Sequence, residues 1–358
     1  MFKFQITQKS KNSFGRQGKI STNHGVFHTP AFMPCATHGA VKSLSPEELK
    51  KMGIEIVLYN TYHMFLRPGD KFIKSAGGLH NFSRWSGPIL TDSGGYQVFS
   101  LREKFVKIKA NGVEFASYLD GKKHFFTPER VIDIQLNLGS DIILVLDVCA
   151  QYPITHTKAK KAMELTHQWA DRSLKYFQKK TKGMKNRQAL FGIIQGSVYK
   201  DLREQSTKFI SALPFDGIAV GGVSVGEGKN NMYKVIRWVA PHLDKTNPHY
   251  LLGVGEPEDL KYAIKYGFDM FDCVLPTRLA RHGTVYSKKG RLDLRRSVYK
   301  KDLRVIEKSC QCSACQGGFS RGYLAHLLQD KEILGVRLLT EHNLYFIQNY
   351  IKEIADFI

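Results

Sequence analysis

From residue 30 onward, short runs of apolar, β-branched and aromatic residues alternate with longer segments whose apolar residues recur at helical spacing. This alternation predicts parallel βα units, in which each strand is followed by a helix that packs on the sheet. The expected strands are residues 30–36, 54–60, 88–92, 141–147, 190–195, 216–221, 249–254 and 268–274. Eight such strands favour an α/β fold of the closed (β/α)₈ (TIM) barrel type over an open doubly wound sheet.

Two helix starts carry a cap in which a hydroxyl side chain precedes a proline, at Ser45-Pro46 and Thr127-Pro128. Residues 1–9 alternate apolar and polar side chains and predict a first strand. Residues 106–126 fit the βα alternation worst, and they predict an inserted hairpin with its turn at Asp120-Gly121. Further amphipathic helices are expected at about 160–180, 199–212, 230–241 and 257–266.

The composition is that of a packed globular protein. Hydrophobic residues make up 42% of the 358 residues, which excludes disorder. No apolar run approaches the ~20 residues of a membrane-spanning helix, so no membrane partner is expected. The N-terminal segment lacks the features of a signal peptide, so we expect a cytoplasmic protein. A change in composition after the last strand predicts a barrel domain over residues 1–290 and a small appended subdomain with closing helices over 291–358.

The charge points to a polyanionic partner. Lys and Arg number 53 against 32 Asp and Glu, which gives a formal charge of +21. This sign and size suit nucleic acid. Basic residues follow the last expected strand, at Arg278, at Arg281 and along 291–308, where they would share one surface with the barrel mouth. A second basic cluster along 158–187 is better explained as the solvated face of a helix.

Three of the six cysteines, Cys310, Cys312 and Cys315, fall within six residues. In a reducing compartment such clustering favours a metal over disulfides. Two later histidines, His326 and His342, could each complete a tetrahedral Zn²⁺ site. A Cys₃His set leaves no open coordination position, so this metal would be structural.

Three aspartates, Asp92, Asp147 and Asp272, end predicted strands. In a (β/α)₈ barrel these ends form the mouth at which chemistry takes place. Two carboxylates that face one substrate can divide the work, one attacking a sugar carbon and the other handling the proton of the leaving group. Glycines at 221–222 and 253–255 allow close approach of a ligand, although tight turns explain them equally well.

Four motifs follow one another along nearly the whole chain. They are residues 60–69 (Asn-Thr-Tyr-His-Met-Phe-Leu-Arg-Pro-Gly), 91–99 (Thr-Asp-Ser-Gly-Gly-Tyr-Gln-Val-Phe), 270–278 (Met-Phe-Asp-Cys-Val-Leu-Pro-Thr-Arg) and the cysteines of 310–315. Together they resemble the tRNA-guanine transglycosylases of the bacterial type. The resemblance implies a zinc-containing (β/α)₈ barrel that exchanges the wobble guanine of certain tRNAs for a 7-deazaguanine, on the path to queuosine. A base swap of this kind needs no nucleotide or redox cofactor.

The resemblance also assigns roles to residues. Asp272 corresponds to the nucleophile that attacks ribose C1′ to form a covalent tRNA intermediate, and Asp92 to the general acid/base. The residues expected to bind the base are Asp147, Gln195, Gly222, Val223 and the stacking ring Tyr96. Arg278 and Arg281 are expected to contact the anticodon. A stacked base must be turned outward before its glycosidic bond is reachable, which suits a pocket at a barrel mouth.

For the metal, the resemblance implies the ligands Cys310, Cys312, Cys315 and His342, with one structural Zn²⁺ per chain. His326 is then expected to lie at a homodimer contact. Phe319 and Tyr323 are expected to join it there.

Two positions depart from the bacterial pattern. Val148 stands where a glutamate usually follows the aspartate. Gly222 is followed by Val223-Ser224, where the bacterial pattern usually has Leu-Ala. These departures leave the incoming base open between 7-aminomethyl-7-deazaguanine and queuine, and we hypothesise that the pocket accepts queuine. The alternative function is a non-catalytic tRNA-binding subunit of a queuine-inserting heterodimer, against which the presence of both Asp92 and Asp272 argues. A further alternative is a phosphate-binding metabolic enzyme with a barrel fold, but that function would not explain the cysteine cluster or the net charge of +21.

Overall fold

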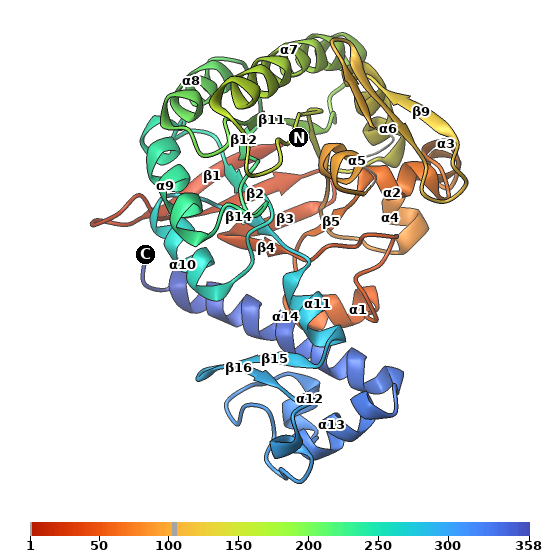
Figure 1. Cartoon of the computed structure of the whole chain (residues 1–358), viewed down its shortest axis with the longest axis vertical. Helices are drawn as coiled ribbons and strands as arrows, with labels where there is room; N and C mark the ends of the chain where they lie inside the picture. The colour runs from red at the N-terminus through yellow and green to blue at the C-terminus, as the bar shows by residue number, and fades with distance from the viewer. Residues whose placement is uncertain (1, 102–105) are drawn as a thin grey trace.

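The computed structural model describes residues 2–101 and 106–358, and its centre is an eight-stranded parallel sheet (Figure 1). Its strands are β4 (Ala31–Met33), β5 (Val57–Tyr59), β6 (Ile89–Thr91), β10 (Ile142–Leu144), β11 (Ala189–Ile194), β12 (Gly217–Val220), β13 (His249–Leu251) and β14 (Met270–Asp272). Their order is β4-β14-β13-β12-β11-β10-β6-β5. A parallel bridge between Cys35 and Leu58 joins the two end strands, so the sheet closes. The predicted barrel and its eight strands are confirmed.

Helices surround the barrel strands. They are α1 (Pro46–Lys51), α2 (Thr61–Leu66), α3 (Asp70–Ser75), α4 (Gly78–Ser83), α5 (Gly95–Leu101), α6 (Pro128–Leu138), α7 (His156–Thr181), α8 (Lys200–Ser211), α9 (Lys229–Val239), α10 (Pro257–Lys265) and α11 (Leu275–Arg281). Both predicted caps are present: Ser45 Oγ accepts from the Glu48 N–H at 3.3 Å, and Thr127 Oγ1 accepts from the Arg130 N–H at 3.1 Å. Among the described residues, no helix combines the length and the apolar character that crossing a bilayer requires.

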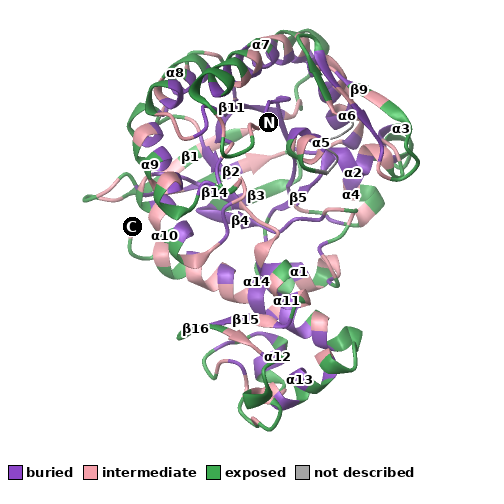
Figure 2. Cartoon of the chain, in the orientation of Figure 1, coloured by how far each residue is buried: buried purple, intermediate pink, exposed green. Residues whose placement is uncertain are grey.

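Burial follows the layers of the barrel (Figure 2). The strands are buried, whereas the covering helices are buried on one side only. A parallel sheet covered on its outside by helices and filled inside by its own side chains has no face toward water, which explains why its strands are continuous apolar runs.

A three-stranded antiparallel sheet closes the amino end of the barrel. It consists of β1 (Lys3–Lys9), β2 (Arg16–Thr22) and β3 (Gly25–Thr29), so the predicted first strand is confirmed. Arg16 binds the buried Asp269, which lies just before β14, through two hydrogen bonds of 3.0 and 2.7 Å. His24 binds Asp141, which lies just before β10, at 2.8 Å. With this end covered, a substrate reaches the barrel only at the carboxyl ends of its strands.

The insertion between β6 and α6 is larger than the expected hairpin. It forms a three-stranded antiparallel sheet of β7 (Lys107–Lys109), β8 (Gly112–Ala116) and β9 (Lys123–Phe126), and the predicted Asp120-Gly121 turn joins the last two. The additional strand β7 was not predicted because all three of its residues are exposed and two are lysines, so it carries little hydrophobic signal.

The C-terminal part packs around a second, smaller core. It contains β15 (Thr284–Ser287), β16 (Gly290–Asp293), α12 (Ser313–Gln316), α13 (Arg321–Gln329) and α14 (Ile333–Ala355). Helix α14 extends from this core back along the barrel, where Gln348 Nε2 donates to the carbonyl of Phe32 at 3.1 Å (Figure 1). The expected boundary between residues 290 and 291 falls within β16, and it stays a prediction.

Candidate active site

The three aspartates singled out in the sequence all lie at the carboxyl ends of barrel strands. Asp272 is the last residue of β14, Asp92 directly follows β6, and Asp147 lies three residues beyond β10. Their side chains therefore approach one another at the open end of the barrel, the end at which such folds carry out chemistry.

Asp92 is held by neutral donors. Its Oδ2 accepts from Asn60 Nδ2 at 2.5 Å and from Gln97 Nε2 at 2.9 Å, and its Oδ1 accepts from the Thr61 N–H at 2.8 Å. Burial raises the pKa of Asp92 to about 6, against these hydrogen bonds, and the charge of Asp272 adds to the rise. A carboxyl group with this pKa exists in both forms near neutral pH, as a general acid/base requires.

Asp272 has two unequal oxygens. Its Oδ1 accepts from the Tyr250 hydroxyl at 2.7 Å and from the Gly253 N–H at 2.8 Å. Its Oδ2 lies 3.6 Å from Cys35 Sγ. Burial raises the pKa of Asp272, and these hydrogen bonds to the ionised form oppose the rise.

Asp147 and Gln195 form one buried polar unit. Asp147 Oδ2 accepts from Gln195 Nε2 at 2.7 Å, and Oδ1 accepts from Ser93 Oγ at 3.0 Å. Burial raises the pKa of Asp147. Gly222 has a φ of +61°, and a Cβ at this residue would lie 2.3 Å from Gln195 Oε1. Only glycine therefore fits against this unit, and the structure brings together the three predicted residues Asp147, Gln195 and Gly222.

The cysteine cluster is separate from these carboxylates. The Sγ atoms of Cys310, Cys312 and Cys315 lie 3.6, 3.4 and 3.5 Å from His342 Nδ1, and all four residues are buried. Tetrahedral zinc with bonds of ~2.3 Å to sulfur and ~2.0–2.1 Å to nitrogen separates such ligands by ~3.6 Å, so the four residues fit this ion. The carbonyl of Tyr286, 2.8 Å from His342 Nε2, can only accept, which leaves the Nδ1 lone pair facing the thiols.

Known proteins resemble this chain over nearly its whole length. The family model described as Queuine tRNA-ribosyltransferase matches residues 10–358. The chain is 50% identical over 354 residues to the Queuine tRNA-ribosyltransferase of Caldanaerobacter subterraneus subsp. tengcongensis. The aligned region covers 99% of this chain and 92% of that protein. Proteins of the same name from Desulforamulus reducens and Thermodesulfovibrio yellowstonii are 48% and 47% identical, over 99% of this chain and 94% and 90% of theirs. This chain belongs to the queuine tRNA-ribosyltransferase family.

Members of this family are tRNA-guanine transglycosylases, which are pentosyltransferases, so the resemblance seen in the four sequence motifs is confirmed. The family implies a tRNA substrate and a guanine-analogue base.

Arg203 was not predicted from the sequence of this queuine tRNA-ribosyltransferase family member, and it lies against the backbone of Gly221 and Gly222. Its fully buried guanidinium donates to the backbone carbonyls of Ser197 at 2.7 Å, Gly221 at 2.8 Å and Gly222 at 2.9 Å. Burial lowers the pKa of Arg203 to about 10, so it stays charged at neutral pH. A signal was available, since Arg203 occupies the apolar face of the predicted helix 199–212.

Glu227 was missed as well. Its buried carboxylate accepts from the N–H groups of Ser224 at 2.5 Å and Val225 at 2.8 Å. Because the N–H and C=O of a trans peptide point in opposite directions, the Val223 carbonyl points away from Glu227. That oxygen lies 4.0 Å from where a Cβ of Gly253 would be, and the Gly253 N–H donates to Asp272.

The remaining predicted contacts lie around the mouth. Tyr96, at the start of α5, is 53% exposed and free to meet a flat ligand. Arg278 and Arg281 lie on α11, directly after Asp272, and Arg281 Nη1 donates to Thr277 Oγ1 at 3.2 Å. His326 is on α13, 3.4 Å from Asp330, and is not part of the cysteine cluster.

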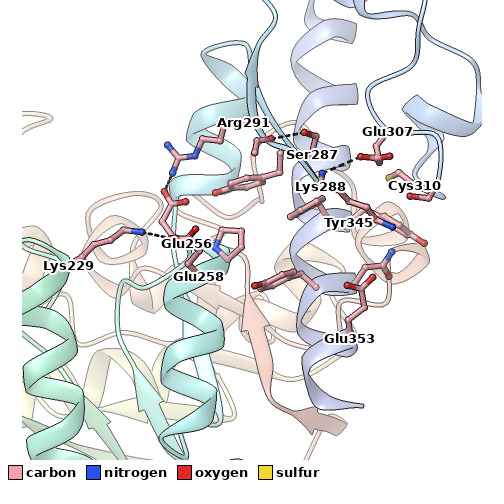
Figure 3. A pocket seen from close by; sticks show the side chains of 17 residues that line it. Lys229, Glu256, Glu258, Ser287, Lys288, Arg291, Glu307, Cys310, Tyr345 and Glu353 are labelled. Carbon is pink, nitrogen blue, oxygen red and sulfur yellow. Dashed lines mark hydrogen bonds and ion pairs between the residues drawn. The ribbon is translucent and has the colours of Figure 1, made fainter. Parts of the chain in front are cut away.

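A separate cavity lies between the barrel and the C-terminal core (Figure 3). It measures about 580 Å³. Lys229 pairs with Glu258 at 3.5 Å, and the backbone N–H of Lys288 donates to Glu307 at 3.2 Å. Since its charged groups are largely matched by partners of their own, we keep the aspartate cluster as the candidate active site.

Proposed function

We propose that this transglycosylase exchanges the wobble guanine of specific tRNAs for a 7-deazaguanine through a covalent bond between Asp272 and the tRNA. An oxygen of Asp272 forms a bond to ribose C1′ while the bond from C1′ to guanine N9 breaks, and the electron pair leaves with the base. Asp92 supplies a proton to the departing guanine. The incoming base then gives a proton to Asp92, attacks C1′ and releases the carboxylate. Two displacements at one carbon retain its configuration.

The position and electrostatics of the two carboxyl groups carry this proposal. Burial raises the pKa of both, that of Asp92 to about 6, and each accepts hydrogen bonds that favour its ionised form. A carboxyl group with a pKa near 6 can give up and take back a proton near neutral pH, which suits Asp92 as acid/base and leaves Asp272 as nucleophile.

The base is proposed to bind between the Asp147–Gln195 unit and the ring of Tyr96. Asp147 and Gln195 offer acceptors and a donor to its amine and amide edge, Gly222 offers its backbone, and Arg278 and Arg281 contact the anticodon. The net charge of +21 supports an RNA substrate.

The test is to trap the enzyme on tRNA under denaturing conditions and map the linked peptide. Attachment at Asp272 is expected, and its loss in Asp272→Asn. A linkage on another side chain, or exchange that persists in Asp272→Asn, would overturn the proposal.

We propose that the incoming base carries a 7-aminomethyl group whose ammonium binds the Val223 carbonyl. Both 7-aminomethyl-7-deazaguanine and queuine contain such an amine, and competition between the two labelled bases separates them. Incorporation of queuine would support the hypothesis drawn from Val148 and Ser224, and its absence would refute it. If neither base outcompetes 7-deazaguanine without the amine, the role of the carbonyl is wrong.

We propose that the Cys₃His cluster binds one structural Zn²⁺. Bound zinc would tie the 310–315 loop to α14 and leave no position for substrate. Chelation is expected to destabilise the C-terminal part before it changes chemistry at Asp272. Unchanged stability of a verified metal-free sample would contradict this.

A homodimer is also proposed, through the stacked rings of Phe319 and Tyr323, whose centroids are 5.7 Å apart, and the neighbouring His326. Tyr323 is 40% exposed in the single chain. The molar mass in solution by light scattering tests this, with Tyr323→Asp expected to yield monomers.

A further inference from the structure

Cys35 occupies an unusual position beside the candidate nucleophile. It lies two residues beyond β4, after Pro34, and forms the bridge to Leu58 that closes the barrel. Its buried Sγ lies 3.6 Å from Asp272 Oδ2, within the range of a hydrogen bond donated by a thiol.

The two oxygens of Asp272 are bound with different strength. Oδ1 accepts two strong hydrogen bonds, from the Tyr250 hydroxyl at 2.7 Å and the Gly253 N–H at 2.8 Å. Within the described part of the chain, the hydrogen bond that Oδ2 accepts comes from Cys35. A thiol is a weak donor, so Oδ2 keeps more of its electron density than Oδ1.

The chemical state of the thiol suits a donor and not a nucleophile. Burial raises the pKa of Cys35 well above its usual value, and the neighbouring Asp272, Cys273 and Asp92 raise it further. Burial also raises the pKa of Tyr250 well above its usual value, and that of Cys273 to about 12. Cys35, Tyr250 and Cys273, which lie around Asp272, therefore keep their protons at neutral pH.

We propose that Cys35 is a positioning residue: its thiol orients Asp272 so that Oδ2 is the oxygen that bonds to ribose C1′. This inference rests on the proposed nucleophilic role of Asp272. As the Oδ2–C1′ bond forms, negative charge leaves the carboxylate and the S–H···O contact weakens, while the proton stays on sulfur throughout. When the incoming base displaces the carboxylate, the charge and the contact return.

A near-isosteric pair of variants tests the inference. Cys35→Val fills the site without a donor, and Cys35→Thr has the same shape with a hydroxyl. For Cys35→Val, the rate of covalent complex formation is expected to fall by ~10-fold, the scale of one hydrogen bond to a charged group. The acid limb of the rate profile should also move to higher pH, since the ionised form of Asp272 loses a donor. Cys35→Thr should restore most of the rate and return the limb toward that of the wild type.

Cys273→Val is the matched control. Its thiol, one residue from Asp272, accepts from the Leu275 N–H at 3.4 Å instead of donating to the carboxylate. The acid limb should therefore stay in place. Thermal unfolding of all three variants separates loss of fold from loss of positioning.

Each failure has its own signature. If Val and Thr at position 35 give the same pH profile as the wild type while Asp272→Asn abolishes the covalent complex, the inference about Cys35 is wrong and the proposed function stands. If the covalent linkage survives in Asp272→Asn, the proposed function itself fails.

Discussion

The two ends of the barrel bury aspartates in opposite environments. At the amino end, Asp269 is bound by the guanidinium of Arg16, and Asp141 by two histidines, His24 at 2.8 Å and His80 at 3.2 Å. At the carboxyl end, Asp92 and Asp272 are held by amide, hydroxyl, thiol and backbone donors. The carboxylates of the amino end thus pair with arginine or histidine side chains, whereas those of the carboxyl end accept hydrogen bonds from uncharged donors.

The pKa values follow the same division. Burial alone would raise the pKa of Asp141, but the hydrogen bonds from His80, His24 and the Ile89 N–H outweigh it, and the pKa lies below the usual value. For Asp92 the effect of burial exceeds that of the hydrogen bonds, and the pKa rises to about 6. The same barrel thus stabilises ionised aspartate at one end and disfavours it at the other.

The largest expected effect comes from Asp272→Asn, which should lower kcat/KM by ~10⁴-fold or more, since the nucleophile is lost. Its stability should change little, because neutral Asn ends the repulsion with Asp92. Steady-state exchange of labelled guanine and thermal unfolding provide the two readouts. If Asp272→Asn instead lowers the thermal stability and keeps most of the activity, the carboxylate of Asp272 serves the fold and not the chemistry.

Asp269→Asn makes the same chemical change at the other end. It leaves the buried charge of Arg16 without its carboxylate partner, which should cost ~3–5 kcal/mol of unfolding free energy. Activity per folded molecule should be preserved. Urea unfolding and active-site titration measure the two quantities, and a loss of turnover without a loss of stability would contradict the assignment.

Arg203 sharpens the comparison, because it is a cation at the reactive end that binds backbone carbonyls. Arg203→Met should raise KM for the free base by ~10-fold, since the carbonyls of Gly221 and Gly222 lose a charged donor. Arg203→Lys keeps the charge and serves as the control. Equal KM values in both variants would mean that the shape of the side chain at position 203, and not its charge, determines how tightly the base binds.

The smallest effect is a difference in pH dependence. The raised pKa of Asp92 means that the folded state holds its proton more tightly than the unfolded state. The stability this adds is present at low pH and is lost as pH rises from about 4 to about 6, by at most about 3 kcal/mol. The free energy of unfolding of Asp92→Asn should therefore rise relative to that of the wild type as pH increases from about 4 to about 6.

Asp141→Asn should show the opposite slope. The lowered pKa of Asp141 contributes stability above the unfolded pKa of about 4 that is lost as pH falls through the folded value. As pH rises from the folded pKa toward about 4, the stability of the variant should fall behind that of the wild type, and the difference should stay constant above that pH. Parallel curves of unfolding free energy against pH for both variants would show that the two ends are equivalent.

The pattern of residues along the chain predicted the barrel strands better than it predicted the hydrogen bonds that hold the site residues. Strands such as β11 are apolar runs that end in a polar residue, so both the barrel and the place of Gln195 followed from local sequence. Hydrogen bonds that oppose the rise in the pKa of Asp92 and that orient Asp272 come from Asn60 and Tyr250, which lie 32 and 22 residues away along the chain. Contacts across such separations depend on how the barrel closes, which no local pattern encodes.

The last long helix has a consequence for synthesis of the chain. Helix α14 contributes Leu344, Ile347 and Ile351 to the barrel core and binds the first barrel strand through Gln348. A nascent chain on the ribosome therefore lacks part of its core packing until α14 has been synthesised. Termination of synthesis before α14 should leave apolar strands uncovered, and the product should be a substrate for chaperones and proteases and not a shortened enzyme.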